Sequence, residues 1–89
     1  MVKEKLLIIN KLGLHARAAM KLVNTASRFG SETVIHHLGN EVNAKSIMNV
    51  LVLGAHQGTE LEFVITGEDE QAALSAIKKL INNRFDEDE

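Results

Sequence analysis

The chain is built around one stretch, Leu12-Gly13-Leu14-His15-Ala16-Arg17-Ala18-Ala19-Met20, in which a loop runs into a helix. Apolar residues recur at spacings of three and four from Ala16 onward, which predicts a helix over residues 16–28. A helix start usually has Ser, Thr, Asp or Asn just outside its first turn, to accept from free backbone N–H groups. Here His15 holds that position. The first turn also carries Arg17, a cation that the positive end of the helix dipole disfavours by about 0.3–1 kcal/mol. Two broken local rules within three residues are typical of a functional site.

The bulk properties are those of an ordinary globular protein. The 89 residues have room for one domain, and 45% of them are hydrophobic and 25% charged. A net charge of -2 and only 3% aromatic residues argue against a nucleic-acid partner. No apolar run approaches the roughly 20 residues that span a bilayer, and the N-terminus lacks a signal-peptide pattern. Cysteine is absent. We therefore expect a cytoplasmic monomer without membrane insertion or disulfides.

Strands are expected on both sides of the first helix. Residues 3–9 form a short apolar strand, and residues 32–38 form a second one that is rich in β-branched side chains. Gly39-Asn40 is a two-residue loop of the kind that closes a tight hairpin, so residues 41–44 are expected to pair with the second strand. Residues 60–66 alternate between apolar and polar side chains, as a strand with one buried face does.

Two further helices complete the chain. Ser46 is expected to cap a short helix over residues 47–53, which Gly54 ends. The acids Glu68-Asp69-Glu70 favour the start of a third helix, and Lys78-Lys79 lie toward its far end. The tail, residues 86–89, is wholly acidic, and we expect it to fray. The order of strands and helices favours an α+β fold with a four-stranded, mainly antiparallel sheet, helices on one face and the other face partly open to water.

The start of the first helix has the chemistry of an anion site. Free N–H groups at a helix N-terminus bind phosphate, and the forked side chain of Arg17 suits phosphate oxygens. His15 supplies a nucleophile there, and the positive helix end favours its neutral ring. We infer a histidine that carries a phosphoryl group, whose charge the backbone amides of the first turn and Arg17 would meet. The alternative is a surface histidine with an unrelated arginine nearby.

The residues around Ser46 permit a structural or a regulatory interpretation. An N-cap serine contributes about 1 kcal/mol on its own, and structure alone is the default explanation for it. A phosphate would also be tolerated there, because a helix start favours negative charge. The apolar residues of this helix nearly encircle it, so part of its surface is expected to be exposed. Ile47 and Met48, with Met20 and Val23 on the first helix, are therefore the candidate contacts for partner proteins, the alternative being an ordinary core role.

Two motifs resemble those of a known family. The stretch Gly13-Leu14-His15-Ala16-Arg17-Ala18-Ala19 is similar to the active-site signature of HPr, the histidine-containing phosphocarrier of the bacterial phosphotransferase system. The stretch Asn43-Ala44-Lys45-Ser46-Ile47-Met48 resembles the second signature of the family, around a regulatory serine. The resemblance covers nearly the whole chain and implies one HPr domain over residues 1–89, an open-faced sandwich of four antiparallel strands and three helices.

The resemblance also implies a function. His15 would take a phosphoryl group at Nδ1 from enzyme I and pass it to an A-type domain of enzyme II. Arg17 and the backbone amide of Ala16 would stabilise the phosphate, and HPr kinase/phosphorylase would modify Ser46. The chain departs from many family members at Asn24 and Ser27, where lysines are common, so it has less positive charge beside His15.

The remaining histidines have no metal-site pattern. His36 and His37 are adjacent in a strand, so their side chains point to opposite faces, and His56 lies in a loop. No carboxylate cluster suited to Mg²⁺ is evident, so we expect no metal or cofactor, and any nucleotide would belong to partner enzymes. We therefore expect a phosphoryl carrier rather than an enzyme.

Three alternatives remain open. The ending Arg84-Phe85-Asp86-Glu87-Asp88-Glu89 is similar to that of the nitrogen-system paralogue NPr, so the chain could serve either the sugar or the nitrogen branch. A small acylphosphatase-like hydrolase would also combine a sheet of this size with an arginine phosphate cradle. A regulatory binding module that has lost phosphoryl transfer is the third alternative.

Overall fold

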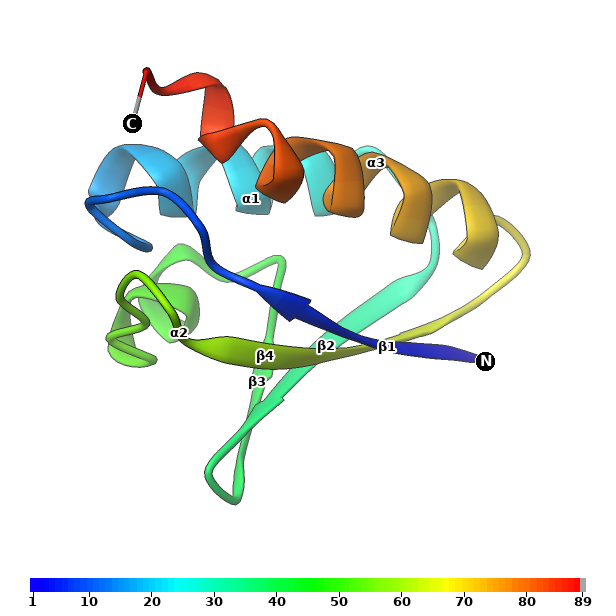
Figure 1. Cartoon of the computed structure of the whole chain (residues 1–89). Helices are drawn as coiled ribbons and strands as arrows, with labels where there is room; N and C mark the ends of the chain where they lie inside the picture. The colour runs from blue at the N-terminus through cyan, green and yellow to red at the C-terminus, as the bar shows by residue number, and fades with distance from the viewer. Residues whose placement is uncertain (89) are drawn as a thin grey trace.

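The computed structural model describes residues 1–88. In chain order the elements are β1 (Val2–Leu7), α1 (Ala16–Ser27), β2 (Glu32–His37), β3 (Asn40–Asn43), α2 (Ile47–Val52), β4 (Glu60–Thr66), α3 (Glu70–Asn82) and the short 3-10 helix η1 (Arg84–Asp86). The strands form one antiparallel sheet with the order β1-β4-β2-β3. Figure 1 shows α1 and α3 side by side across one face of this sheet. The expected α+β fold is confirmed, a four-stranded antiparallel sheet with three α-helices.

Alternation along the strands directs one set of side chains into the core. Leu61, Phe63 and Ile65 of β4 are fully buried, and Leu6 of β1 lies opposite Leu61. The helices cover these residues with Ala19, Leu22 and Ala26 of α1, Val50 of α2 and Ala73, Ile77 and Ile81 of α3, all fully buried. The opposite face of the sheet is open, as expected, with Lys3 and Lys5 of β1 exposed on it.

The β2–β3 hairpin differs by one residue from the sequence prediction. Its two turn residues are Leu38 and Gly39, with φ of 50° and 82°, and Asn40 is already a strand residue paired with His37. Both central residues of a type I′ turn need positive φ, which matches the twist of the flanking strands. Gly39 therefore takes the second turn position and Leu38, a residue with no special preference for positive φ, takes the first.

The acidic residue before the third helix, Asp69, bonds to another loop instead of to the start of its own helix. Asp69 precedes α3, but its carboxylate makes no cap bond to the helix. It accepts hydrogen bonds from the backbone N–H of Gly30 at 2.9 Å, from that of Ser31 at 2.9 Å and from the Ser31 hydroxyl. The start of α3 is thereby tied to the connection between α1 and β2.

Candidate functional site

His15 is the N-cap of α1. Its backbone is extended, with φ of -74° and ψ of 177°, and its ring Nδ1 accepts the backbone N–H of Arg17 at 3.2 Å. The first turn carries no acidic residue, as the sequence indicated. The predicted helix start is confirmed, and the cap that seemed to be missing is the imidazole itself. The Nδ1 lone pair is therefore directed at the positive end of the helix.

The loop before His15 is held by a close backbone contact. Gly13 has φ of +67°, and a Cβ on it would lie 2.6 Å from the carbonyl oxygen of Ala55 and 2.6 Å from the Cα of His56. The next residue, Leu14, is buried and donates its N–H to the same Ala55 carbonyl at 2.8 Å. Only glycine fits between these two loops, so Gly13 fixes the direction from which the chain enters α1.

The C-terminal segment brings a carboxylate to His15 that sequence reasoning missed. Nε2 of His15 pairs with Oε2 of Glu87. The other Glu87 oxygen accepts from Nδ2 of Asn10 at 2.9 Å, and the same Asn10 nitrogen donates to the Gly13 carbonyl at 2.8 Å. Burial alone would raise the pKa of Glu87. The hydrogen bonds from Asn10 and His15, together with the positive charge of Arg17, outweigh burial and hold the pKa of Glu87 below its ordinary value.

A buried aromatic residue explains why this segment lies here. Phe85 is fully buried, and η1 reverses the chain after α3 with positive φ at three successive residues, 84–86. Lys21 of α1 donates to the Phe85 carbonyl at 2.8 Å and lies 3.5 Å from the Asp86 carboxylate. The structure therefore differs from the expected frayed tail at Asp86 and Glu87, because Phe85 anchors them. Glu89 lies outside the described residues.

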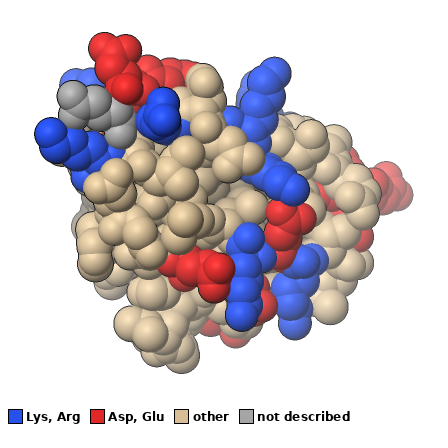
Figure 2. Space-filling model, viewed as in Figure 1, with Lys and Arg blue, Asp and Glu red and all other residues tan. Residues whose placement is uncertain are grey.

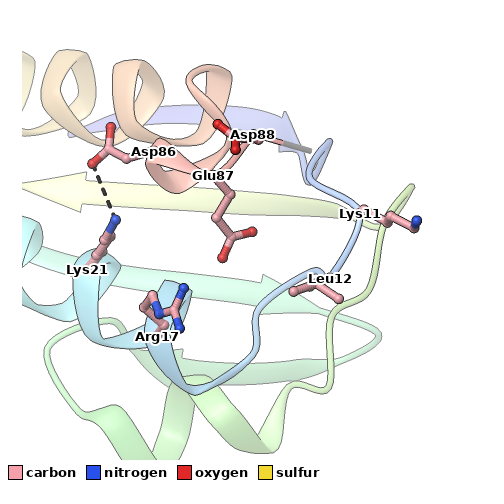
Figure 3. Close-up of a pocket in the computed structure, with 7 residues that line it drawn as sticks. All are labelled: Lys11, Leu12, Arg17, Lys21, Asp86, Glu87 and Asp88. Atoms are coloured by element: carbon pink, nitrogen blue, oxygen red, sulfur yellow. Dashed lines mark ion pairs between the residues drawn. The ribbon is translucent and has the colours of Figure 1, made fainter.

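A groove separates this C-terminal segment from α1 and the loop before it. Figure 3 shows Glu87 pointing from the C-terminal segment toward the start of α1, where Arg17 stands, with Lys21 paired to Asp86 farther along the helix. Arg17 is exposed and its side chain borders the groove. The lining residues are Lys11, Leu12, Arg17, Lys21, Asp86, Glu87 and Asp88. Basic and acidic side chains thus face each other beside His15.

Ser46 is the N-cap of α2, as predicted. Its backbone is extended and its hydroxyl accepts the backbone N–H of Asn49 at 3.5 Å, a long hydrogen bond. Lys45 donates to the Phe29 carbonyl at 2.8 Å, which ties the approach to α2 to the end of α1. This bond gives the unmodified Ser46 hydroxyl a structural role at the start of α2.

The four candidate partner contacts divide into two pairs. Met20 and Met48 are 56% and 67% exposed, whereas Val23 and Ile47 are half-buried and packed against the core. Val52, at the end of α2, is 78% exposed and was not singled out from the sequence. In Figure 2 the region of α2 is covered mainly by uncharged atoms, whereas basic and acidic side chains gather near the C-terminal segment. The exposed surface of this helix is therefore uncharged, and Met48 and Val52 are its exposed large apolar side chains.

The described residues show neither a metal-binding cluster nor a membrane-spanning helix. Residues 1–88 hold no group of three or more His, Cys, Asp or Glu side chains that could bind a metal ion. His36 lies 3.8 Å from Glu41 across the hairpin and has no such cluster around it. Within the same range no helix is both long and apolar enough to cross a bilayer.

Comparisons with known proteins identify the family of the chain. Residues 2–83 match the family model described as the PTS HPr component phosphorylation site. The phosphocarrier protein HPr of Xylella fastidiosa strain 9a5c is 53% identical over 88 residues, covering 99% of both chains, and that of Neisseria meningitidis serogroup A is 47% identical over 100% of both. The structure of HPr-C-His from Thermoanaerobacter tengcongensis is 40% identical with a TM-score of 0.96 over 100% of both chains. That of HPr from Bacillus anthracis is 34% identical with a TM-score of 0.86, covering 90% of this chain and 95% of the other. With a helix-capping histidine beside an exposed arginine on this fold, the chain belongs to the HPr family of phosphocarrier proteins of the phosphotransferase system.

Proposed function

We propose that His15 accepts a phosphoryl group on Nδ1 from enzyme I and passes it to A-type domains of enzyme II. The observation that carries the proposal is that Nδ1 is the N-cap acceptor of α1. The oxygens of a phosphoryl group on Nδ1 would accept the hydrogen bond of the Arg17 N–H in place of Nδ1. They would also accept from the backbone amide of Ala16 at the positive end of the helix. The exposed Arg17 guanidinium would pair with the phosphoryl oxygens in a forked geometry.

The central test is phosphoryl acceptance by wild type and His15→Ala. Incubation with enzyme I and phosphoenolpyruvate should load the wild type with acid-labile, base-stable phosphate and leave His15→Ala unlabelled. His56→Ala is the matched control, because His56 is an exposed loop histidine outside the groove, and it should load like the wild type. Labelling of His15→Ala would refute the assignment of the site. A wild type that accepts no phosphate would instead favour the regulatory binding module.

The same assay separates the two branches of the system. The chain should be offered enzyme I of the sugar system and its nitrogen-system counterpart in parallel, because its acidic ending resembles NPr while its Ser46 segment resembles sugar-system HPr. We propose the sugar branch, since the matched relatives are named phosphocarrier protein HPr. Faster loading by the nitrogen-system enzyme would reverse this choice. An acylphosphatase-like hydrolase is not proposed, because those relatives are named as carriers.

We further propose that HPr kinase/phosphorylase modifies Ser46. The support is the motif around Ser46 and its position as the N-cap of α2, where added negative charge is favourable. The phosphate would then place charge beside the apolar surface of α2 and weaken docking without unfolding the helix. ATP-dependent labelling should occur in the wild type and in Ser75→Ala, an exposed serine of α3, and disappear in Ser46→Ala.

The exposed methionines are proposed as the docking contacts, with Val23 and Ile47 supporting them from below. Met20 and Met48 offer flexible apolar side chains to more than one partner. Met48→Asp should slow phosphoryl loading by enzyme I without changing the free energy of unfolding. Leu38→Asp, at an exposed position of the β2–β3 turn, should load at the wild-type rate. Equal rates in both variants would exclude Met48 from the interface. We also propose that the protein works in the cytoplasm as a monomer.

A further inference from the structure

The ring nitrogen that the proposed phosphoryl transfer does not use has a carboxylate partner of its own. Nε2 of His15 pairs with Glu87, a residue 72 positions away in the chain. Nδ1 accepts the N–H of Arg17, so it carries no proton, and in a neutral imidazole the proton must then be on Nε2. That proton lies between Nε2 and the Glu87 carboxylate.

We propose that Glu87 is a positioning residue for His15: its carboxylate holds the proton on Nε2 and orients the ring so that the Nδ1 lone pair serves as the nucleophile. This inference rests on the proposed phosphoryl acceptance at His15. A carboxylate on the far nitrogen has this role for histidines that bind metals or act as catalytic bases, where it fixes both tautomer and orientation.

Glu87 is itself held in place on the protein side. Its side chain is only 12% exposed, and Asn10, which is fully buried, donates to the oxygen that does not face His15. Asn10 also bonds to Gly13, so the loop before α1 and the C-terminal segment share one anchor. The hydrogen bonds and the charge of Arg17 that lower the pKa of Glu87, against the effect of burial, keep it ionised at neutral pH.

The negative charge of Glu87 favours the proposed phosphoryl transfer to Nδ1 of His15. The Nδ1 lone pair forms the N–P bond while the bond from phosphorus to the donor breaks, and the electron pair of that bond leaves with the donor. No proton leaves the ring, which stays protonated on Nε2 and becomes more positive as Nδ1 bonds to phosphorus. A fixed carboxylate at Nε2 stabilises this developing charge, as preorganised groups do when charge appears in a transition state.

The first test reads the ring directly in the unphosphorylated protein. In ¹⁵N-labelled wild type, NMR should show a hydrogen-bonded Nε2–H proton of His15 that exchanges slowly with water. Glu87→Ala should lose this signal, and Glu68→Gln should keep it, because Glu68 is an exposed carboxylate outside the groove and its change also removes one negative charge. Thermal unfolding of each variant checks that Phe85 still anchors the segment. A signal that is missing in the wild type, or unchanged in Glu87→Ala, would overturn the proposal.

The second test measures loading by enzyme I and phosphoenolpyruvate. Glu87→Ala should load more slowly by about 10-fold, the lower end for loss of a group that orients a functional histidine. Glu68→Gln, which removes an exposed carboxylate outside the groove, should load at the wild-type rate. Glu87→Gln, which keeps the size and loses the charge, should fall between them. An unchanged or faster rate in Glu87→Ala would refute positioning, and a faster rate would show the contact to be inhibitory. Phosphate found on Nε2 in the wild type would refute it as well. If wild type accepts no phosphate at all, the proposed function fails while the NMR test still decides the contact between Glu87 and His15.

Discussion

At the residue scale, His15 combines two properties that usually belong to different side chains. It caps a helix, a task normally given to Ser, Thr, Asp or Asn, and it is the nucleophile in the proposed phosphoryl transfer. The two properties use the same lone pair on Nδ1. The cap bond is long, at 3.2 Å, which suits the proposed phosphorylation, in which phosphoryl oxygens would accept from the helix N–H groups in its place.

Gly13 is the residue on which the placement of His15 depends. Gly13→Ala should destabilise the protein by at least about 1 kcal/mol, because its φ is +67° and the new Cβ would lie 2.6 Å from backbone atoms of the 55–56 loop. Urea unfolding measures the effect. Gly30→Ala is the matched control, since a Cβ there meets nothing within 4 Å, and it should change stability little. Equal effects of the two substitutions would contradict this account of the loop.

At the element scale, hydrogen bonds from N-cap side chains fix where helices begin. Ser46→Ala should destabilise the protein by about 0.5–1 kcal/mol, at the lower end of the usual range for N-caps, because its bond to Asn49 is long at 3.5 Å. Chemical denaturation measures the difference. Ser75→Ala, at an exposed position within α3, should be neutral or slightly stabilising because alanine favours helices. A Ser46→Ala protein as stable as the wild type would show that α2 needs no cap.

Asp69 should make stability depend on pH at the start of α3. The hydrogen bond from the Ser31 hydroxyl, followed by that from the Gly30 N–H, lowers the pKa of Asp69, while burial acts in the opposite direction. A carboxyl group whose pKa is lower in the folded state stabilises the protein above its unfolded pKa, and this stabilisation is lost as the pH falls through the folded pKa.

The matching experiment compares the stability of Asp69→Asn with that of the wild type from neutral pH down through the unfolded and the lower folded pKa of Asp69. Asp69→Asn should be less stable near neutral pH, and the difference between the two proteins should shrink as the pH falls. Thermal unfolding at several pH values measures it. Glu68→Gln removes a neighbouring exposed charge and should leave the pH dependence in place. A constant gap between wild type and Asp69→Asn would rule out the proposed linkage.

At the scale of the whole molecule, Phe85 joins the end of the chain to the site. Phe85→Ala should destabilise the protein by about 3–5 kcal/mol, because Phe85 is fully buried between helices and core. It should also release Glu87 from His15, which the Nε2–H signal would report. Leu38→Ala is matched in positive φ but is 86% exposed, so it should change stability little. Retention of both stability and the His15 signal in Phe85→Ala would contradict the anchoring role.

Local patterns in the sequence determined most of the fold and one half of the site. The spacing of apolar residues predicted α1, Ser46 predicted the start of α2, and alternation predicted β4, because each of these signals acts between residues a few positions apart. His15 and Arg17 were recognisable because they break local rules for a helix start. The hairpin turn was misplaced by one residue, since Leu38 carries no local mark of the positive φ that the strand twist imposes on it.

Only the tertiary structure decided the other half of the site. Nothing near Glu87 in the sequence indicates a partner for it, and an acidic chain end usually frays. Glu87 contacts His15 because burial of Phe85 turns the chain back over α1. Lys21 then donates a hydrogen bond to the Phe85 carbonyl, and Asn10 donates one to the Glu87 carboxylate. Burial is set by what lies across the core rather than by neighbours in the chain. His15, the proposed nucleophile, was therefore readable from the sequence, and its carboxylate partner Glu87 was not.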